Sequence, residues 1–196
     1  MKNKKKNFFN LSNGITGLMI LFIITMLIVP GVKSSVIQGL MNIGLFQPDI
    51  SDNQENKTLV DNSVAFKGQD GETISLNDLK SKVVFINFWA TWCPPCIAEM
   101  PAINKMKQHF KDDNNVVILM VDADNNLKKS VQFMKRKKYD LSVFLPATSI
   151  PENMFQSSLP TTLVIDKKGQ IVFKHEGAAD YKNQKFIDFM DKLRKE

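Results

Sequence analysis

Two cysteines, Cys93 and Cys96, are the only ones in the chain of 196 residues, and two prolines separate them. They follow directly on an apolar run at 83–89 and precede a segment, 97–110, in which apolar residues recur every three or four positions. This pattern predicts a buried strand followed by a helix that begins at the cysteines. A thiol at a helix N-terminus faces unpaired backbone N–H groups and the positive end of the helix dipole, and both favour the nucleophilic thiolate. We therefore predict a redox-active dithiol in which Cys93 attacks a disulfide and Cys96 resolves the mixed disulfide.

Two other uses of the cysteine pair are less well supported. A structural disulfide between residues so close in the chain closes a very short loop and removes little conformational entropy from the unfolded state. A zinc site needs four ligands, but the chain has no second cysteine pair, and His109 and His175 lack the spacing of zinc ligands. The sequence thus favours disulfide exchange.

The net charge of +6 is located at the N-terminus. Five of the 26 basic residues precede Pro48, and the first acidic residue is Asp49, so 21 basic residues face 20 acidic ones in the rest of the chain. The basic excess therefore belongs to a leader and forms no face of a domain. Nothing in the charge distribution indicates a nucleic acid as partner.

The N-terminal segment predicts a membrane-anchored protein. Residues 1–14 form a basic tail, and residues 15–32 carry no charge over eighteen positions, which suffices for a short membrane-spanning helix. Basic residues before an apolar span hold the N-terminus in the cytoplasm. We therefore predict a single-pass protein of the bacterial inner membrane with a periplasmic or otherwise extracytoplasmic domain. A signal peptide cleaved near Val32-Lys33-Ser34 is the alternative, and a retained anchor is favoured because the apolar run reaches the length of a span.

Residues 33–62 are predicted to be an amphipathic segment and a tether between the anchor and the domain. The apolar residues of 36–46 suit either a helix on the bilayer surface or a short helix packed against the domain. Residues 47–62 are polar and acidic and have little to bury, which is typical of a flexible connection.

Residues 63–196 have the pattern of one α/β domain. Continuous apolar runs predict strands that are buried on both faces, and periodicities of three to four residues predict helices between them. The expected elements are a hairpin at 64–75, a turn or short helix at 76–79, strands at 83–89 and 116–121, helices near 97–110 and 127–134, a strand at 143–145, a short helix at 151–156, a hairpin at 161–174 and a closing helix near 186–193. This order describes an α/β sandwich with a central mixed sheet, and the C-x-x-C at a strand-to-helix turn narrows it to a thioredoxin-like fold.

The run from Val84 to Pro101, VFINFWATWCPPCIAEMP, resembles the TlpA/ResA-like thioredoxins, and a weaker similarity extends from about Val64 to the end of the chain. Members of that family are membrane-tethered thiol–disulfide oxidoreductases that face the bacterial envelope. The resemblance implies reduction of disulfides in envelope proteins, with apocytochrome c as one candidate, by electrons from a membrane dithiol donor. We expect no cofactor beyond the Cys93–Cys96 disulfide. The direction of the reaction depends on the reduction potential, which no single residue encodes.

In that family a proline after a cis peptide bond lies against the dithiol, and Leu159-Pro160-Thr161 matches its position just before a strand. Proline has no backbone N–H, so this edge stays free for the backbone of a substrate. The resemblance thus predicts a cis Leu159–Pro160 bond and a substrate contact at these three residues. An ordinary trans turn proline is the alternative.

Glu99 matches an acid of the same family that manages protons beside the disulfide. A half-buried carboxyl near two sulfur atoms would have a raised pKa and could take the proton of the Cys96 thiol. Asn87 occupies the strand position at which cytoplasmic thioredoxins carry a buried acid, and this absence gives Glu99 more weight. An exposed helix glutamate without a role is the alternative.

Three residues beside the cysteines are candidates for substrate binding. Trp92 could shield the dithiol and contact a partner. Pro94 and Pro95 stiffen the loop, and Pro95 removes one N–H that could have stabilised the Cys93 thiolate.

Two other functions remain open from the sequence. A thiol peroxidase of related fold activates its cysteine with Thr and Arg, but the arginines, Arg136 and Arg194, are far from the motif in the chain. A Cu(I)-binding envelope chaperone could use both thiolates, although no His or Met stands within the motif.

Overall fold

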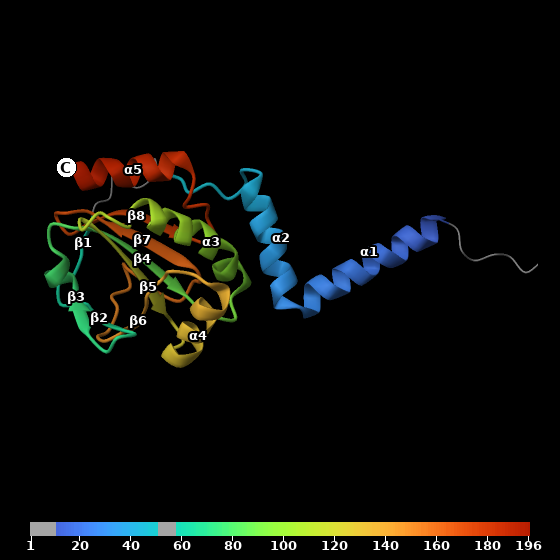
Figure 1. The fold of residues 1–196 in the computed structure, drawn as a ribbon, viewed down its shortest axis with the longest axis horizontal. Coiled ribbons are helices and arrows are strands. Elements are labelled where there is room, and N and C mark those ends of the chain that lie inside the picture. Colours follow the sequence, from blue (N-terminus) through green and yellow to red (C-terminus); the bar gives the residue numbers. More distant parts are fainter. Residues whose placement is uncertain (1–10, 51–57) are drawn as a thin grey trace, which may run out of the picture.

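The computed structural model describes residues 11–50 and 58–196. One mixed sheet of eight strands runs through the domain in the order β1-β8-β7-β4-β5-β6-β2-β3 (Figure 1). The strands are β1 Thr58–Leu59, β2 Ala65–Gly68, β3 Thr73–Ser75, β4 Val83–Trp89, β5 Val116–Asp122, β6 Val143–Pro146, β7 Thr161–Ile165 and β8 Gln170–Glu176. The helices are α1 Leu11–Ile28, α2 Pro30–Asn42, α3 Pro94–His109, α4 Leu127–Lys137 and α5 Gln184–Lys195, and Leu76–Leu79 forms a 3-10 turn.

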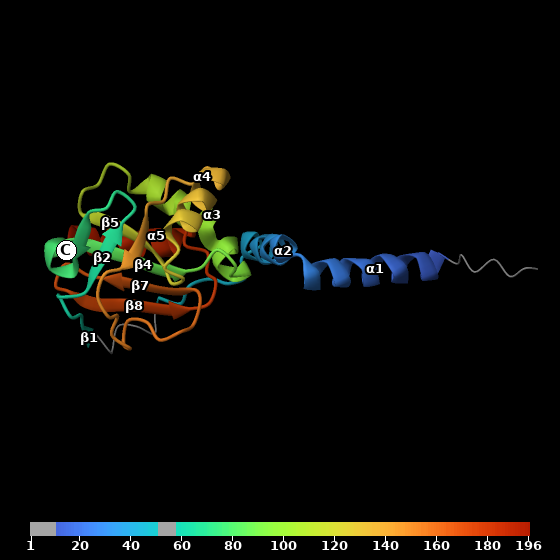
Figure 2. The same ribbon diagram turned by 90° about the horizontal axis from the view of Figure 1, so that it is seen from below.

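Strand β4 lies at the centre of the sheet, and all seven of its residues are buried. It pairs in parallel with β5 and antiparallel with β7, so the sheet is mixed as expected. Because successive side chains of a strand point to opposite faces, the apolar run divides between two clusters. Phe85 and Trp89 pack toward α3, α4 and α5, whereas Ile86 and Phe88 pack toward the hairpin β2–β3 and its 3-10 turn. Figure 2 shows α3, α4 and α5 on one side of the central strands.

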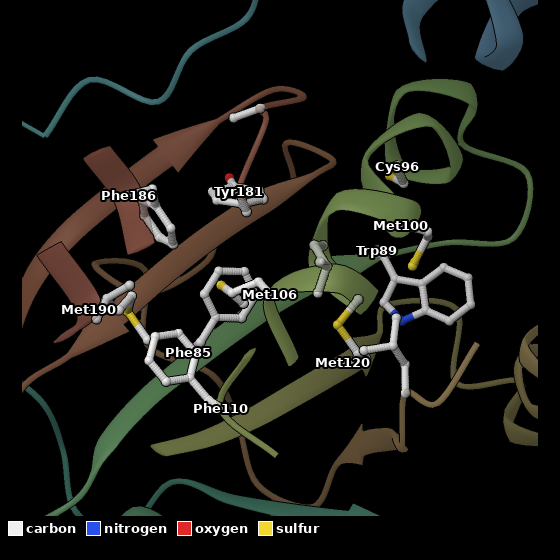
Figure 3. Close-up of a cluster of buried hydrophobic side chains, with 14 of the residues drawn as sticks. Phe85, Trp89, Cys96, Met100, Met106, Phe110, Met120, Tyr181, Phe186 and Met190 are labelled. Atoms are coloured by element: carbon white, nitrogen blue, oxygen red, sulfur yellow. The ribbon is translucent and has the colours of Figure 1, made fainter. Parts of the chain in front are cut away.

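Aromatic rings fill the core between the sheet and α5. The Phe85 ring lies 5.2 Å from Tyr181 and 6.2 Å from Phe186, in edge-to-face arrangements, and Figure 3 labels these three side chains. Phe186 in turn lies 5.3 Å from Phe173. Such pairs add stability beyond the apolar area that they bury. The closing helix is thereby fixed to β4, the strand that leads to the cysteines.

The structure confirms the expected hairpins, central strands and helices and differs in three places. Residues 151–156, which were expected to form a short helix, form turns instead. Helix α4 continues to Lys137, beyond the predicted end near residue 134, and it buries Ser130, Phe133 and Met134. Strand β1 lies inside the predicted tether, where Thr58 pairs with Ile171 of β8.

The N-terminal helix is divided where a single segment at 15–32 was expected. Helix α1 ends at Ile28, and α2 begins at Pro30, whose missing N–H is tolerated only in the first turn of a helix. Among residues 11–50 and 58–196, no single helix is long and apolar enough to cross a membrane, whereas 14–28 and 31–42 pass together with a bend of 104°. Most of the predicted basic tail, 1–14, lies outside the described residues.

The segment that follows α1 is docked on the domain. Of the two alternatives for residues 36–46, the structure shows a helix packed against α3, in which Met41 is 2% exposed. The first part of the predicted tether is therefore a fixed part of the molecule.

A substitution at the end of α4 should stabilise the domain. Lys138 adopts a left-handed conformation with φ of 58°, which costs an L-residue about 1 kcal/mol and costs glycine almost nothing. We expect Lys138→Gly to raise the free energy of unfolding by about 0.5–1 kcal/mol in urea titrations. Lys135→Gly, inside the same helix, is the matched control and should lower it by a similar amount; equal effects of the two changes would contradict the explanation.

Candidate active site

The cysteines stand where the central strand passes into α3. Ala90, Thr91 and Trp92 connect the two elements, and Cys93 is the N-cap residue of a helix whose first two positions are Pro94 and Pro95. Both prolines occupy positions where a helix makes no use of an N–H group. The prediction that the cysteine pair stands at a helix N-terminus is confirmed.

Cys93 and Cys96 form a disulfide with a Cα–Cα distance of 5.3 Å. The Cys93 sulfur also accepts a hydrogen bond from the Cys96 backbone N–H at 3.3 Å. Cys96 is fully buried and Cys93 is 3% exposed, whereas the neighbouring Trp92 is 58% exposed. An N–H directed at the sulfur favours a negative charge there, so the geometry suits Cys93 as the thiolate.

Glu99 lies one turn after Cys96 on α3 and is completely buried. One carboxyl oxygen accepts a hydrogen bond from the Asn87 side-chain amide at 2.7 Å, and the other accepts one from the Ala179 backbone N–H at 3.2 Å. The alternative of an exposed helix glutamate is therefore wrong, and burial is more complete than the half-buried position expected from the sequence.

Burial raises the pKa of Glu99 to about 8, because the ionised carboxyl loses its hydration. The hydrogen bonds from Asn87 and Ala179 act in the opposite direction, since both donate to the charged form. A carboxyl with a pKa in this range exchanges its proton near neutral pH. Buried groups of this kind concentrate at functional sites.

Asn87 connects Glu99 to a row of polar residues across the sheet. Its amide also donates to the Thr162 hydroxyl at 2.9 Å, and Thr162 is paired in register with His175 of β8. Burial lowers the pKa of His175. Tyr181 is buried close by, and its pKa is raised well above the usual value, first by burial and then by the charge of Glu99.

The sequence predicts no contact between these residues and Glu99. Asn87 was singled out only for the acid that it replaces, and Thr162, Ala179 and Tyr181 were given no role. Their one signal in the sequence is a polar residue inside an otherwise apolar central strand, which needs a hydrogen-bond partner when it is buried.

The predicted cis peptide bond between Leu159 and Pro160 is present. Pro160 directly precedes β7, whose first residue, Thr161, pairs with Phe88 near the end of β4. Pro160 therefore lies at the same edge of the sheet as the cysteine turn that follows β4. The Pro160 carbonyl accepts the Gly177 N–H at 2.8 Å, and Thr161 is buried with its hydroxyl bonded to the Ser158 carbonyl at 2.7 Å. The expected substrate segment thus lies beside the dithiol.

The part of the chain that the structure describes contains no group of three or more His, Cys, Asp or Glu side chains that could hold a metal. Of the two arginines, Arg194 pairs with Asp113 and Asp191, at 2.8 Å and 2.6 Å. The guanidinium of Arg136 lies 5.8 Å from the centre of the Phe133 ring.

The chain matches a known protein family over most of its length. The Redoxin family model matches residues 48–187, which is well over half of the sequence. The chain belongs to the Redoxin family. The match includes the cysteine turn, Glu99 and the cis proline, so the whole candidate site lies inside the family domain.

Two proteins that are similar to this redoxin are both named thiol-disulfide oxidoreductase ResA. It is 39% identical over 106 residues to the thiol-disulfide oxidoreductase ResA of Bacillus cereus, over 54% of this chain and 61% of that relative. It is 35% identical over 130 residues to the ResA protein of Halalkalibacterium halodurans, over 65% and 71%. The chain thus spans less than two thirds of the former relative.

A solved structure supports the thioredoxin-like fold of this redoxin. The crystal structure of the pneumococcal exposed lipoprotein thioredoxin of Streptococcus pneumoniae superposes with a TM-score of 0.53 and 26% identity. The superposition covers 67% of this chain and 98% of that one. The predicted fold class of the domain is therefore confirmed.

The raised pKa of Glu99 predicts a pH-dependent contribution to stability. In the unfolded chain this carboxyl ionises near pH 4.5, and in the fold near 8, so between these values only the folded state holds the proton. The free energy of unfolding should therefore fall as pH rises through this interval, by at most about 1.4 kcal/mol for each pH unit.

Glu99→Gln replaces the titrating carboxyl with a neutral amide. We expect the stability of the variant relative to the wild type to rise between pH 5 and pH 9, by on the order of 1–3 kcal/mol. Denaturant titrations of both oxidised proteins at each pH measure the difference. A difference that stays constant over this range would show that Glu99 does not titrate there.

Proposed function

We propose that this redoxin is a membrane-associated extracytoplasmic thiol–disulfide oxidoreductase that reduces disulfides in other proteins. One observation carries the proposal: the only two cysteines of the chain are joined at the N-terminus of α3, one turn before a completely buried glutamate. The ResA relatives are named as thiol-disulfide oxidoreductases, which agrees with this chemistry.

The reaction begins from the reduced dithiol. The Cys93 thiolate attacks one sulfur of a substrate disulfide, that bond breaks, and the second substrate sulfur leaves as a thiolate that takes up a proton. Cys96 then attacks the Cys93 sulfur in the mixed disulfide. The Cys93–Cys96 disulfide forms, the bond between Cys93 and the substrate breaks, and the substrate sulfur leaves as a thiolate that takes up a proton from water.

Glu99 acts on the second of these steps. Cys96 is buried, so its thiol proton cannot pass directly to water. The Glu99 carboxylate, one turn away on α3, takes that proton and thereby makes Cys96 a nucleophile. When a donor reduces the disulfide again, the protonated carboxyl returns the proton to the Cys96 sulfur.

The cis-proline edge and the tryptophan are proposed as the contact surface for substrates. The backbone beside Leu159, Pro160 and Thr161 lies at the edge of the sheet where the dithiol stands. Trp92 is the exposed side chain of the cysteine turn, and Pro94 and Pro95 keep that turn rigid. Side chains that are exposed and aromatic are frequent at sites of protein recognition.

Partners follow from the location that the ResA resemblance suggests. Envelope proteins with disulfides, apocytochrome c among them, are the proposed substrates, and a dithiol protein of the membrane supplies the electrons. The apolar N-terminal segment, 15–32, is proposed to hold the chain at the inner membrane with the catalytic domain outside the cytoplasm.

Cysteine variants test the two roles. We expect Cys93→Ser to reduce the rate of insulin reduction to background, because the attacking sulfur is gone. Cys96→Ser should instead accumulate a mixed disulfide with insulin, which mass spectrometry detects. If Cys93→Ser forms the adduct and Cys96→Ser does not, the two roles are reversed.

Glu99→Gln should slow insulin reduction by about 100-fold and abolish the change of rate near pH 8. Asp188→Asn, an exposed change on α5, is the matched control and should leave the rate unaltered. A Glu99→Gln profile parallel to that of the wild type would contradict a role in proton transfer.

The midpoint potential of the Cys93–Cys96 couple tests the direction. We expect a value near that of cytoplasmic thioredoxin, about −270 mV, in glutathione or dithiothreitol redox titrations. A value near about −120 mV would identify an oxidant and overturn the reductive direction.

A further inference from the structure

Helix α2 lies across the first half of the active-site helix α3 (Figure 1). Its Met41 is 2% exposed and packs with Ala98 and Ala178, and Ile37 covers the same cluster. Ala98 is the chain neighbour of Glu99, and Ala178 is the neighbour of Ala179. The small apolar cluster therefore joins the two backbone segments that carry the partners of the 3.2 Å hydrogen bond between the Ala179 N–H and Glu99.

Polar contacts hold the same loop from the same side. The Phe46 carbonyl accepts the Asp180 N–H at 2.9 Å. The Lys182 ammonium donates to the Asn42 side chain at 3.1 Å and also pairs with the buried Asp180 carboxyl at 3.0 Å. A further side-chain hydrogen bond joins Asn183 and Gln47. The chain from α2 to Gln47 thus contacts the loop 177–183 along most of its length.

The loop is also attached to the sheet and the core, in part by a hydrogen bond between the Ala178 backbone and His175. At its start, the Gly177 N–H donates to the Pro160 carbonyl, and at its centre the Tyr181 ring is buried in the core. Between them lie Ala178, which packs with Met41, and Ala179, which is buried in the main core. Ala178 packs on Met41 and the Asp180 N–H bonds to the Phe46 carbonyl, so α2 and the residues after it hold the loop on both sides of the Ala179 N–H.

We propose that α2 acts as a clamp: by packing against Ala98 and Ala178, it holds the Ala179 N–H within hydrogen-bond distance of the Glu99 carboxyl. Met41 is its positioning residue. The inference rests on the proposed role of Glu99 in proton transfer. Because α2 follows the apolar helix α1 directly, the clamp makes proton uptake at the dithiol depend on how the N-terminal segment is seated.

Release of the clamp has a defined electrostatic sign. The Ala179 N–H donates to the ionised carboxyl, so its withdrawal makes the charged form less stable and raises the pKa of Glu99. The titratable side chains near this carboxyl are Tyr181 in the loop and His175 in the neighbouring row of the sheet, and Cys93 and Cys96 carry no titrating thiol while they form a disulfide. None of them belongs to α2, so α2 acts through the position of the backbone.

The test uses the full-length oxidised protein in detergent micelles and two matched variants. Met41→Asn places a neutral polar amide in the apolar contact and adds no charge that could act on Glu99. Leu40→Asn makes the same change at the next residue, which is 37% exposed. Met41→Leu restores an apolar side chain of similar size and serves as the rescue.

Hydrogen–deuterium exchange followed by mass spectrometry first measures the loop. We expect exchange of the peptide that contains Ala179 to be at least about tenfold faster in Met41→Asn, because an opened hydrogen bond loses its protection. Leu40→Asn and Met41→Leu should exchange as the wild type does. Unchanged exchange in Met41→Asn would overturn the clamp.

Carbon-13 NMR titration of glutamate side-chain carboxyls, with Glu99 assigned from Glu99→Gln, then measures the consequence. We expect the pKa of Glu99 to rise by about half to one unit in Met41→Asn and not in Leu40→Asn. Faster exchange without this rise would overturn the coupling. Insulin reduction by the wild type tests the proposed function separately, so failure of that assay would refute the oxidoreductase and a negative titration would refute the clamp.

Discussion

The site is organised around a carboxyl group that is completely buried from solvent. Glu99 is completely buried, and the two donors that satisfy it come from the central strand and from the loop after β8. Removing an ionised carboxyl from water is costly unless its charge is compensated, and two hydrogen bonds compensate it only in part. The result is a pKa of about 8, which keeps the group close to the point where it gains or loses a proton.

The sheet and the helix together bring this carboxyl to the sulfur atoms. Strand β4 is held by rings from the loop after β8 and from α5, and it passes into α3 through a turn of three residues. Asn87 on the strand and Glu99 on the helix are therefore in fixed register with the cysteines between them. The antiparallel partner β7 begins at the same edge, which places the cis proline beside the turn. A rigid scaffold with the reactive residues at its edge is a common arrangement in enzymes.

Sequence patterns predicted the elements better than they predicted the contacts. The run at 83–89 and the stripe at 97–110 were sufficient to place the dithiol at a strand-to-helix turn, because both signals are local. The hydrogen bonds of Glu99 join residues 12 and 80 positions apart, which no periodicity encodes. The break at Pro30 was missed because hydropathy counts apolar residues and disregards a proline that starts a second helix. The turns at 151–156 were read as helix from a segment too short for periodicity to decide.

The docking of α2 changes how the catalytic domain can move. A flexible leader would let the domain sweep through a volume set by the length of the leader. Here residues 37–47 are fastened to α3 and to the loop before α5 by apolar packing and hydrogen bonds. The distance from the end of α1 to the cysteine pair is consequently fixed. In the proposed membrane-anchored arrangement, a partner held in the same bilayer would meet the sulfur atoms at one constant height, by lateral diffusion in two dimensions.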